Sequence, residues 1–152
     1  MIAVIVPHKI SNIKKGNDMV IFKAKIVMIS NVVYIQKQTP IDEAIEILAD
    51  KNITGLPVVN GDMTLAGVIS EKEVMQLLYD NGTMSDIVED FMTENPLSFE
   101  QEDNLIDIAE CFMKNNFRRV PITSEGKLVG IVSRRNIIEY ILQLRRKDPV
   151  TV

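Results

Sequence analysis

Residues 56–70 read LPVVNGDMTLAGVIS, and residues 120–133 read VPITSEGKLVGIVS. Each stretch has a short apolar segment containing a proline, a polar turn, and a second apolar segment that ends in glycine, two apolar residues and serine. A pattern that returns after about sixty residues is typical of one supersecondary unit used twice. Because a single copy is too small to bury its own apolar face, we expect the two copies to pack together and the function to lie between them.

The repetition extends well beyond these two stretches. Residues 28–57 match residues 92–121 without a gap at a separation of 64 positions, and the separation falls to 63 beyond the turn, which is one residue shorter in the second copy. Such a length change costs little in a turn. The sequence therefore predicts an N-terminal arm (1–24), a first repeat (25–79), a linker (80–90), a second repeat (91–144) and a basic C-terminal tail (145–152).

Each repeat is predicted to run strand, helix, strand, strand, helix. Apolar residues within 41–48 have the i, i+3, i+4, i+7 spacing of one helix face, and those within 105–112 repeat it. The remaining elements of the first copy are strands at 32–35, 56–59 and 65–69, a hairpin turn at Asn60-Gly61, and a second helix with Val74, Leu77 and Leu78 on one face. The fold class is thus α/β: two β-α-β-β-α repeats related by pseudo-twofold symmetry, with mixed sheets and helices on one side.

Several local features complete this prediction. Pro57 and Pro121 are expected at the start of their strands, where a missing N–H is tolerated. We expect a strand or arm at 1–7, a loop at 11–18, a turn-rich stretch at 80–83, and a short helix that ends near Met92 and is capped by Ser85 or Asp86.

Composition narrows the class of protein. The chain has 152 residues, 46% of them hydrophobic, which is enough for a compact core, and its net charge of −4 argues against nucleic-acid binding. The apolar residues 1–7 lack a basic leader and are too few for a signal peptide or membrane span. A single cysteine, Cys111, excludes internal disulfides and favours a reducing, cytoplasmic setting, and we expect it to be a small buried hydrophobe.

An enzyme is the main alternative class, and the sequence argues against it. The lone histidine, His8, lies in the N-terminal arm, and no histidine or cysteine cluster has the spacing of metal ligands. The chain contains neither a GxGxxG nor a Walker A sequence for cradling phosphates. We therefore expect no catalytic residue, no metal and no cofactor.

The segment ITGLPVV at 53–59, followed by GVIS at 67–70 and a helix, resembles the CBS domain, named for cystathionine β-synthase, which occurs in tandem as a Bateman module. The resemblance covers about residues 25–144. It implies a regulatory, non-catalytic module that binds AMP, ADP, ATP or S-adenosylmethionine in clefts between the copies. It also implies a homodimer. Because we recognise no effector domain in the sequence, we expect the output to lie in a separate effector protein, or the chain to be a fragment of a longer one.

The resemblance places the ribose-binding residues at the turn from strand to helix. There the family has Ser or Thr and, three positions later, an Asp that accepts hydrogen bonds from both ribose hydroxyls. Here the positions hold Ser70 with Glu73, and Ser133 with Asn136, so neither copy keeps the Asp. Glu73 retains a charged acceptor, whereas Asn136 offers one acceptor oxygen. The alternative is local: Ser70 and Glu73 have the spacing of a capping box, and Ser133 is a good N-cap.

The phosphate-binding residues implied by the resemblance are basic. Arg118 and Arg119 precede the second proline-containing strand, while Arg134 and Arg135 follow Ser133. Lys72 is the basic residue of the first copy. Guanidinium groups bind phosphate oxygens bidentately. The alternative is a solvated surface in which the arginines pair with Glu100, Glu102 or Asp103.

Two clefts follow from the resemblance, each drawing on both copies. The favoured cleft combines Ser70 and Glu73 with Arg118, Arg119 and Arg135, and places the adenine between Leu97 and Pro121. The other cleft combines Ser133 and Asn136 with Thr54, Gly55 and Lys72, and places the adenine between Val33 and Pro57. Core packing is the alternative role of those four apolar residues. Two further alternatives stay open, a purely structural dimerisation module with empty clefts and a binder of S-adenosylmethionine.

Overall fold

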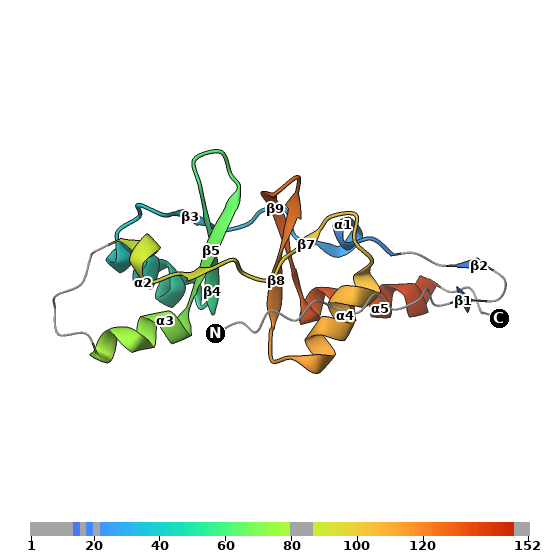
Figure 1. Cartoon of the computed structure of the whole chain (residues 1–152). Helices are drawn as coiled ribbons and strands as arrows, with labels where there is room; N and C mark the ends of the chain where they lie inside the picture. The colour runs from blue at the N-terminus through green and yellow to red at the C-terminus, as the bar shows by residue number, and fades with distance from the viewer. Residues whose placement is uncertain (1–13, 16–17, 20–21, 80–86, 148–152) are drawn as a thin grey trace. The chain divides into compact units, whose positions relative to one another are not determined.

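The computed structural model describes residues 14–15, 18–19, 22–79 and 87–147 (Figure 1). The chain forms two compact units. Unit 1 contains Val33–Leu97 together with Gly126–Leu128, and unit 2 contains the described residues up to Val32, Ser98–Glu125 and those from Val129 onward.

Unit 1 is built on a four-stranded mixed sheet in the order β3-β4-β5-β6. The first pair is parallel and the other two pairs are antiparallel. Figure 1 shows α2 and α3 on the same side of the β4–β5 hairpin. The elements are β3 (Ile35–Gln36), α2 (Ile41–Lys51), β4 (Gly55–Val59), β5 (Leu65–Ser70), α3 (Glu71–Gln76), and the 3-10 turns η1 (Leu77–Tyr79) and η2 (Val88–Asp90), and β6 (Thr93–Glu94).

The core of unit 1 forms where α2 packs on the hairpin. Ile41, Ala44 and Leu48 lie at the predicted i, i+3, i+7 positions and are all buried, which confirms the helix. They pack against Leu56 and Ile69 of the strands, both of which are fully buried. Each such aliphatic side chain contributes about 1.5–3 kcal/mol on burial, so this contact stabilises the unit.

Unit 2 repeats the arrangement with a sheet in the order β7-β8-β9, in which β7 is parallel to β8. Helix α4 (Leu105–Lys114) is capped by Asn104, whose side chain accepts from the Ile106 N–H, and buries Leu105, Ile108 and Phe112 as predicted. The elements are β1 (Lys14–Lys15), β2 (Asp18–Met19), α1 (Ala24–Val27), β7 (Phe99–Glu100), α4 (Leu105–Lys114), β8 (Arg119–Ser124), β9 (Lys127–Ser133, whose first two residues belong to unit 1) and α5 (Arg134–Lys147).

Each unit also contains the first residues of the other repeat, and a glycine makes room for them. In unit 1 a Cβ on Gly67 would lie 2.8 Å from Met92 Sδ and 2.6 Å from the Thr93 carbonyl oxygen. In unit 2 a Cβ on Gly130 would lie 2.8 Å from Met28 Sδ. Both glycines are therefore required for close approach rather than for a turn.

Some local predictions were wrong. The first strand is Ile35–Gln36 rather than 32–35, and Lys14–Lys15 pairs with Asp18–Met19 where we expected a loop. Pro57 is the third residue of β4, as Pro121 is of β8; it is tolerated because β3 pairs only with Val58 and Val59.

The second helix of the first repeat is also shorter than its pattern indicates. The α-helix ends at Gln76, and Leu78 is 87% exposed instead of lying on a buried face. The short helix before Met92 is present as η2, with Ile87 at its N-cap. The expectations for 1–7, 80–83, Ser85, Asp86 and His8 lie outside the described residues.

Candidate functional site

The helix start after β5 holds the first pair of predicted ribose ligands. Ser70 and Glu73 form a capping box: the Ser70 side chain accepts from the Glu73 N–H, and Glu73 Oε2 accepts from the Ser70 N–H at 2.8 Å. The Ser70 hydroxyl donates to the same carboxylate oxygen. The capping role that the sequence left open is therefore present.

Thr93 adds a contact that the sequence did not indicate. Its hydroxyl donates to Glu73 Oε1 at 2.6 Å from β6, a short strand at the start of the second repeat. Thr93 belongs to no motif, so only the pairing of β5 with β6 brings it near Glu73. The sequence held one indication of a special role for Thr93. The matching residue of the first copy is Ile29, which carries no hydroxyl, so the two copies differ at this position.

The environment of Glu73 keeps its carboxylate charged. The side chain is only 8% exposed, and burial by itself would raise its pKa. Hydrogen bonds from the Ser70 and Thr93 side chains outweigh burial, so the pKa of Glu73 is lowered. A carboxylate offers about four lone-pair sites. With three hydrogen bonds donated by Ser70 and Thr93, Glu73 retains room for one further donor.

The second pair of predicted ribose ligands makes the same kind of contact more weakly. Asn136 Oδ1 accepts from the Ser133 N–H at 2.8 Å, and the Asn136 N–H donates to the Ser133 hydroxyl at 3.1 Å. These are neutral hydrogen bonds, about half as strong as those to a carboxylate. For both pairs the ribose role stays a prediction.

Arg118 and Arg119 are exposed at the start of β8: Arg118 precedes the strand and Arg119 is its first residue. Within the part of the chain that the structure describes, neither side chain makes an ion pair or a hydrogen bond. The acidic residues considered as their partners are engaged elsewhere: Glu102 binds two lysines, and Glu100 accepts from the Thr123 hydroxyl and the Glu125 N–H. Asp103 accepts from the Glu100 N–H.

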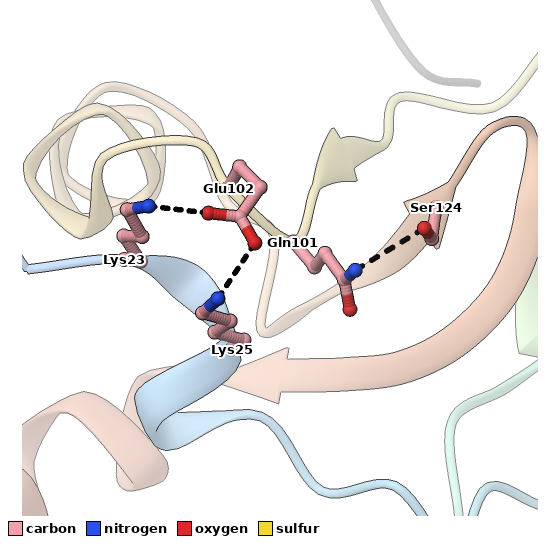
Figure 2. Close-up of polar contacts among 5 residues, drawn as sticks. All are labelled: Lys23, Lys25, Gln101, Glu102 and Ser124. Carbon is pink, nitrogen blue, oxygen red and sulfur yellow. Dashed lines mark hydrogen bonds and ion pairs between the residues drawn. The ribbon is translucent and has the colours of Figure 1, made fainter.

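The network around Glu102 ties α1 to the loop before α4 (Figure 2). Lys25 Nζ lies 2.7 Å from one carboxylate oxygen of Glu102, and Lys23 Nζ contacts the other. The hydrogen bond from Lys23, which has the larger effect, and that from Lys25 lower the pKa of Glu102 to about 2. Beside it, Gln101 Nε2 donates to Ser124 Oγ at 3.2 Å. Since these ion pairs are half exposed, they contribute little to stability.

The other predicted basic residues differ in their surroundings. Arg135 pairs with Glu139 one turn along α5 at 2.9 Å, and Lys72 is exposed. Arg134 directs its guanidinium group at the backbone instead, donating to the carbonyl oxygens of Phe112, Asn115 and Phe117.

The four predicted adenine contacts are divided between the units. Val33, Pro57 and Leu97 belong to unit 1, and Pro121 to unit 2. Both prolines are buried, Leu97 is partly buried and Val33 is 36% exposed. Each predicted cleft draws on residues of both units. That these residues form a cleft therefore stays a prediction.

Three further findings concern other classes of site. Cys111 is a free, buried cysteine, as expected, and burial raises the pKa of its thiol. Among the described residues, no group of three or more His, Cys, Asp or Glu side chains is placed to hold a metal ion. No helix in those same ranges is long and apolar enough to span a membrane.

Comparison with known proteins identifies the family. The CBS domain model matches residues 24–80 and 88–143, so the chain belongs to the CBS domain family and carries two copies. It is 34% identical to the uncharacterized protein MJ1225 of Methanocaldococcus jannaschii over 115 residues, covering 76% of this chain and 41% of that protein. It is 30% identical to the chloroplastic CBS domain-containing protein CBSX2 of Arabidopsis thaliana over 146 residues, covering 77% of this chain and 61% of that one.

Solved structures agree with this fold. The crystal structure of CBSX2 in complex with AMP matches with a TM-score of 0.75 and 32% identity, covering 82% of this chain and 99% of that one. The CBS domain pair of MJ0100, in complex with 5′-methylthioadenosine and S-adenosyl-L-methionine, matches with a TM-score of 0.68 and 25% identity, covering 82% of this chain and 98% of that one. The mixed α/β fold with two CBS repeats is therefore confirmed.

The curated relatives are longer than the matched region. The chain spans 41% of MJ1225 and 61% of CBSX2. A match to inosine-5′-monophosphate dehydrogenase of M. jannaschii covers 93% of this chain but only 25% of that protein. That similarity concerns a quarter of the dehydrogenase and does not carry its activity over to this chain.

Proposed function

We propose that this protein is a regulatory module that binds an adenine nucleotide (AMP, ADP or ATP) between its two CBS repeats and catalyses no reaction. The observation that carries the proposal is the exposed pair Arg118–Arg119, two adjacent guanidinium groups whose candidate acidic partners are engaged elsewhere among the described residues. Such a pair suits a polyanionic phosphate chain. The AMP bound to CBSX2 supports the choice of ligand.

In this proposal the favoured cleft combines both units. Arg118, Arg119 and Arg135 contact phosphates, and Pro121 with Leu97 encloses the adenine. Glu73 is already held by Ser70 and Thr93, so it accepts one ribose hydroxyl without losing an existing hydrogen bond. The second cleft, with Ser133, Asn136, Lys72, Val33 and Pro57, binds more weakly because its acceptor is neutral.

Melting scans against AMP, ADP, ATP, adenosine and S-adenosylmethionine test the proposal. A ligand at a hundred times its dissociation constant adds about 2.7 kcal/mol to the free energy of unfolding, which raises the melting temperature by several degrees. If no nucleotide shifts the transition, the clefts are degenerate and the structural alternative holds. A shift with S-adenosylmethionine alone would favour the second candidate, which the MJ0100 complex supports.

We further propose that the module acts as a cytoplasmic homodimer that signals to a separate effector protein. Each unit presents an apolar stripe at matching positions of the repeat. In unit 1 the stripe is Met75, Leu78 and Tyr79, which are 58%, 87% and 86% exposed. In unit 2 it is Ile138, Ile141 and Leu142, which are 64%, 49% and 46% exposed. Exposed apolar surface of this kind marks protein contacts.

Sedimentation equilibrium tests the dimer. Tyr79→Glu should shift the protein to monomer, whereas Lys51→Glu, an exposed change of charge outside the stripe, should not. A wild-type protein that sediments as a monomer at every concentration would remove this part of the proposal.

A further inference from the structure

We infer that Arg134 is a positioning residue that fixes the loop carrying Arg118 and Arg119, and thereby sets the affinity of the module for the phosphates of its nucleotide. The inference rests on the proposed function, because it gives Arg134 a role in that same site. It differs from the sequence expectation, in which Arg134 was itself one of the basic contacts.

Arg134 supplies a hydrogen-bond donor to a backbone carbonyl group at the C-terminal end of α4. This helix does not close in the left-handed conformation that usually satisfies the last carbonyl groups: its C-cap residue Asn115 is extended, with φ of −133°. Carbonyl oxygens in the last turn of a helix have no partner within the helix. Arg134 Nη2 donates to one of them, the Phe112 oxygen, at 2.8 Å. The guanidinium group also lies over the Phe112 ring, 5.8 Å from its centroid.

The same guanidinium group also donates to two carbonyl oxygens in the loop that follows α4. Arg134 Nη2 donates to the Asn115 oxygen at 2.6 Å, and Nε donates to the Phe117 oxygen at 2.6 Å. The Arg134 backbone N–H then donates to the Arg118 oxygen at 3.1 Å. One residue thus holds the backbone from the helix end to the residue whose side chain is free to bind phosphate. The planar fork of arginine suits this because its donors have fixed directions.

The first repeat provides an internal comparison. Its matching helix, α2, ends at Asn52 in the left-handed conformation, with φ of 50°, and the Asn52 N–H bonds to the Leu48 and Ala49 oxygens. Glu71 occupies the position that matches Arg134; its backbone N–H donates to the Thr54 oxygen at 3.0 Å, but its carboxylate has no N–H to donate. The side-chain clamp is therefore specific to the repeat that carries the arginine pair.

Isothermal titration with ATP and with adenosine tests the inference, using Arg134→Gln and Arg134→Lys beside wild type. Arg146→Gln is the matched control, since it removes one exposed charge from the same helix. We expect Arg134→Gln to weaken ATP by about tenfold, as when one charge-assisted hydrogen bond is no longer held in place, and adenosine by less than about twofold. Arg134→Lys should fall between, because it keeps the charge but loses the fork.

Hydrogen exchange of the ligand-free proteins separates positioning from direct contact. If Arg134 only contacted the phosphate, its substitution would not change the exchange of the loop amides in the absence of ligand. Faster exchange of the amides at 115–119 in Arg134→Gln, together with the selective loss of ATP affinity, supports the inference. Loss of ATP affinity with unchanged exchange would mean that Arg134 contacts the phosphate itself, and overturns it. A lower melting temperature with an unchanged ratio of ATP to adenosine affinity would mean a purely structural role, and also overturns it.

Failure of the proposed function has a different signature. Wild-type protein that binds neither ATP nor adenosine would remove the nucleotide site, and the phosphate role of Arg134 with it, whatever the exchange rates show. Wild-type binding with an Arg134→Gln variant of equal ATP preference would remove only this inference.

Discussion

The hydrogen bond from Thr93 to Glu73 allows a prediction with a calculable size. Thr93→Val keeps the shape of the side chain and removes the hydroxyl that donates to Glu73 Oε1 at 2.6 Å. A hydrogen bond to a charged group contributes about 1.5–3 kcal/mol, and the carboxylate is only 8% exposed, so water replaces the hydroxyl poorly. Part of the loss is recovered as the site relaxes. We expect the free energy of unfolding to fall by about 1–2 kcal/mol at pH 7.

The pH dependence of this loss follows from the direction of the pKa shift. The pKa of Glu73 is lowered in the folded state from its usual 4.5, so its charge stabilises the fold above that pH. The stability is lost as the pH falls through the folded pKa. Because the valine variant lacks one of the hydrogen bonds that lower the pKa, its folded pKa should be higher. The difference between variant and wild type should therefore be largest at neutral pH and shrink progressively below pH 4.5.

Urea denaturation across this pH range measures the effect. Thr64→Val is the comparison variant, since the Thr64 hydroxyl also donates to a carboxylate at 2.6 Å, that of Asp62, but at an exposed position where water can replace it. The variant also removes the hydrogen bond from Asn60 Nδ2 to the Thr64 hydroxyl, at 2.9 Å. We expect it to cost less than Thr93→Val, and to show no loss of its deficit tied to the pKa of Glu73. A Thr93→Val variant as stable as wild type at pH 7, or one whose deficit is the same on both sides of pH 4.5, would refute the reasoning.

Three further predictions follow from the same contacts. Arg118→Ala should weaken ATP and ADP more than adenosine in isothermal titration, because the proposed site places its guanidinium group on phosphate alone; an equal loss for all three would remove it from that role. Gly67→Ala should destabilise the protein by about 1–3 kcal/mol in thermal unfolding, since the new Cβ would lie 2.6 Å from the Thr93 oxygen, whereas Gly61→Ala, with nothing within 4 Å, should be neutral. Glu102→Gln should lower the melting temperature slightly at low salt and not at about 1 M salt, because the ion pairs to Lys23 and Lys25 are half exposed and screened; a salt-independent effect would contradict this.

The periodic elements could be predicted from the sequence because their patterns are long. Residues 41–48 and 105–112 each mark one buried helix face, and both helices are present with those residues facing the core. The hairpin of β4 and β5 was likewise indicated by two apolar runs around a turn. Two-residue strands such as β3 and β6 carry no periodicity, so their positions depend on which neighbour offers a free edge.

The candidate site was predictable only in part, for a similar reason. Ser70 and Glu73 are three residues apart, so their capping box could be recognised from the sequence. Thr93 lies 20 positions from Glu73, and Arg134 reaches carbonyl groups up to 22 positions away. Contacts of that range leave no local pattern, and backbone carbonyls as acceptors leave none at all, because every residue has one.

The two repeats therefore differ where their functions would differ, although their sheets and first helices match. The first repeat holds a charged acceptor, Glu73, in place with Ser70 and Thr93, while the second has neutral Asn136 in the same position. The second repeat alone has the Arg134 clamp and the pair Arg118–Arg119, whose loop Arg134 contacts. A cleft that takes its ribose acceptor from the first repeat and its phosphate ligands from the second would combine both fixed groups, and its counterpart would have neither. On this argument titration should give one strong nucleotide site per chain, and two sites of equal affinity would mean that Glu73 and Arg134 are held in place for stability alone.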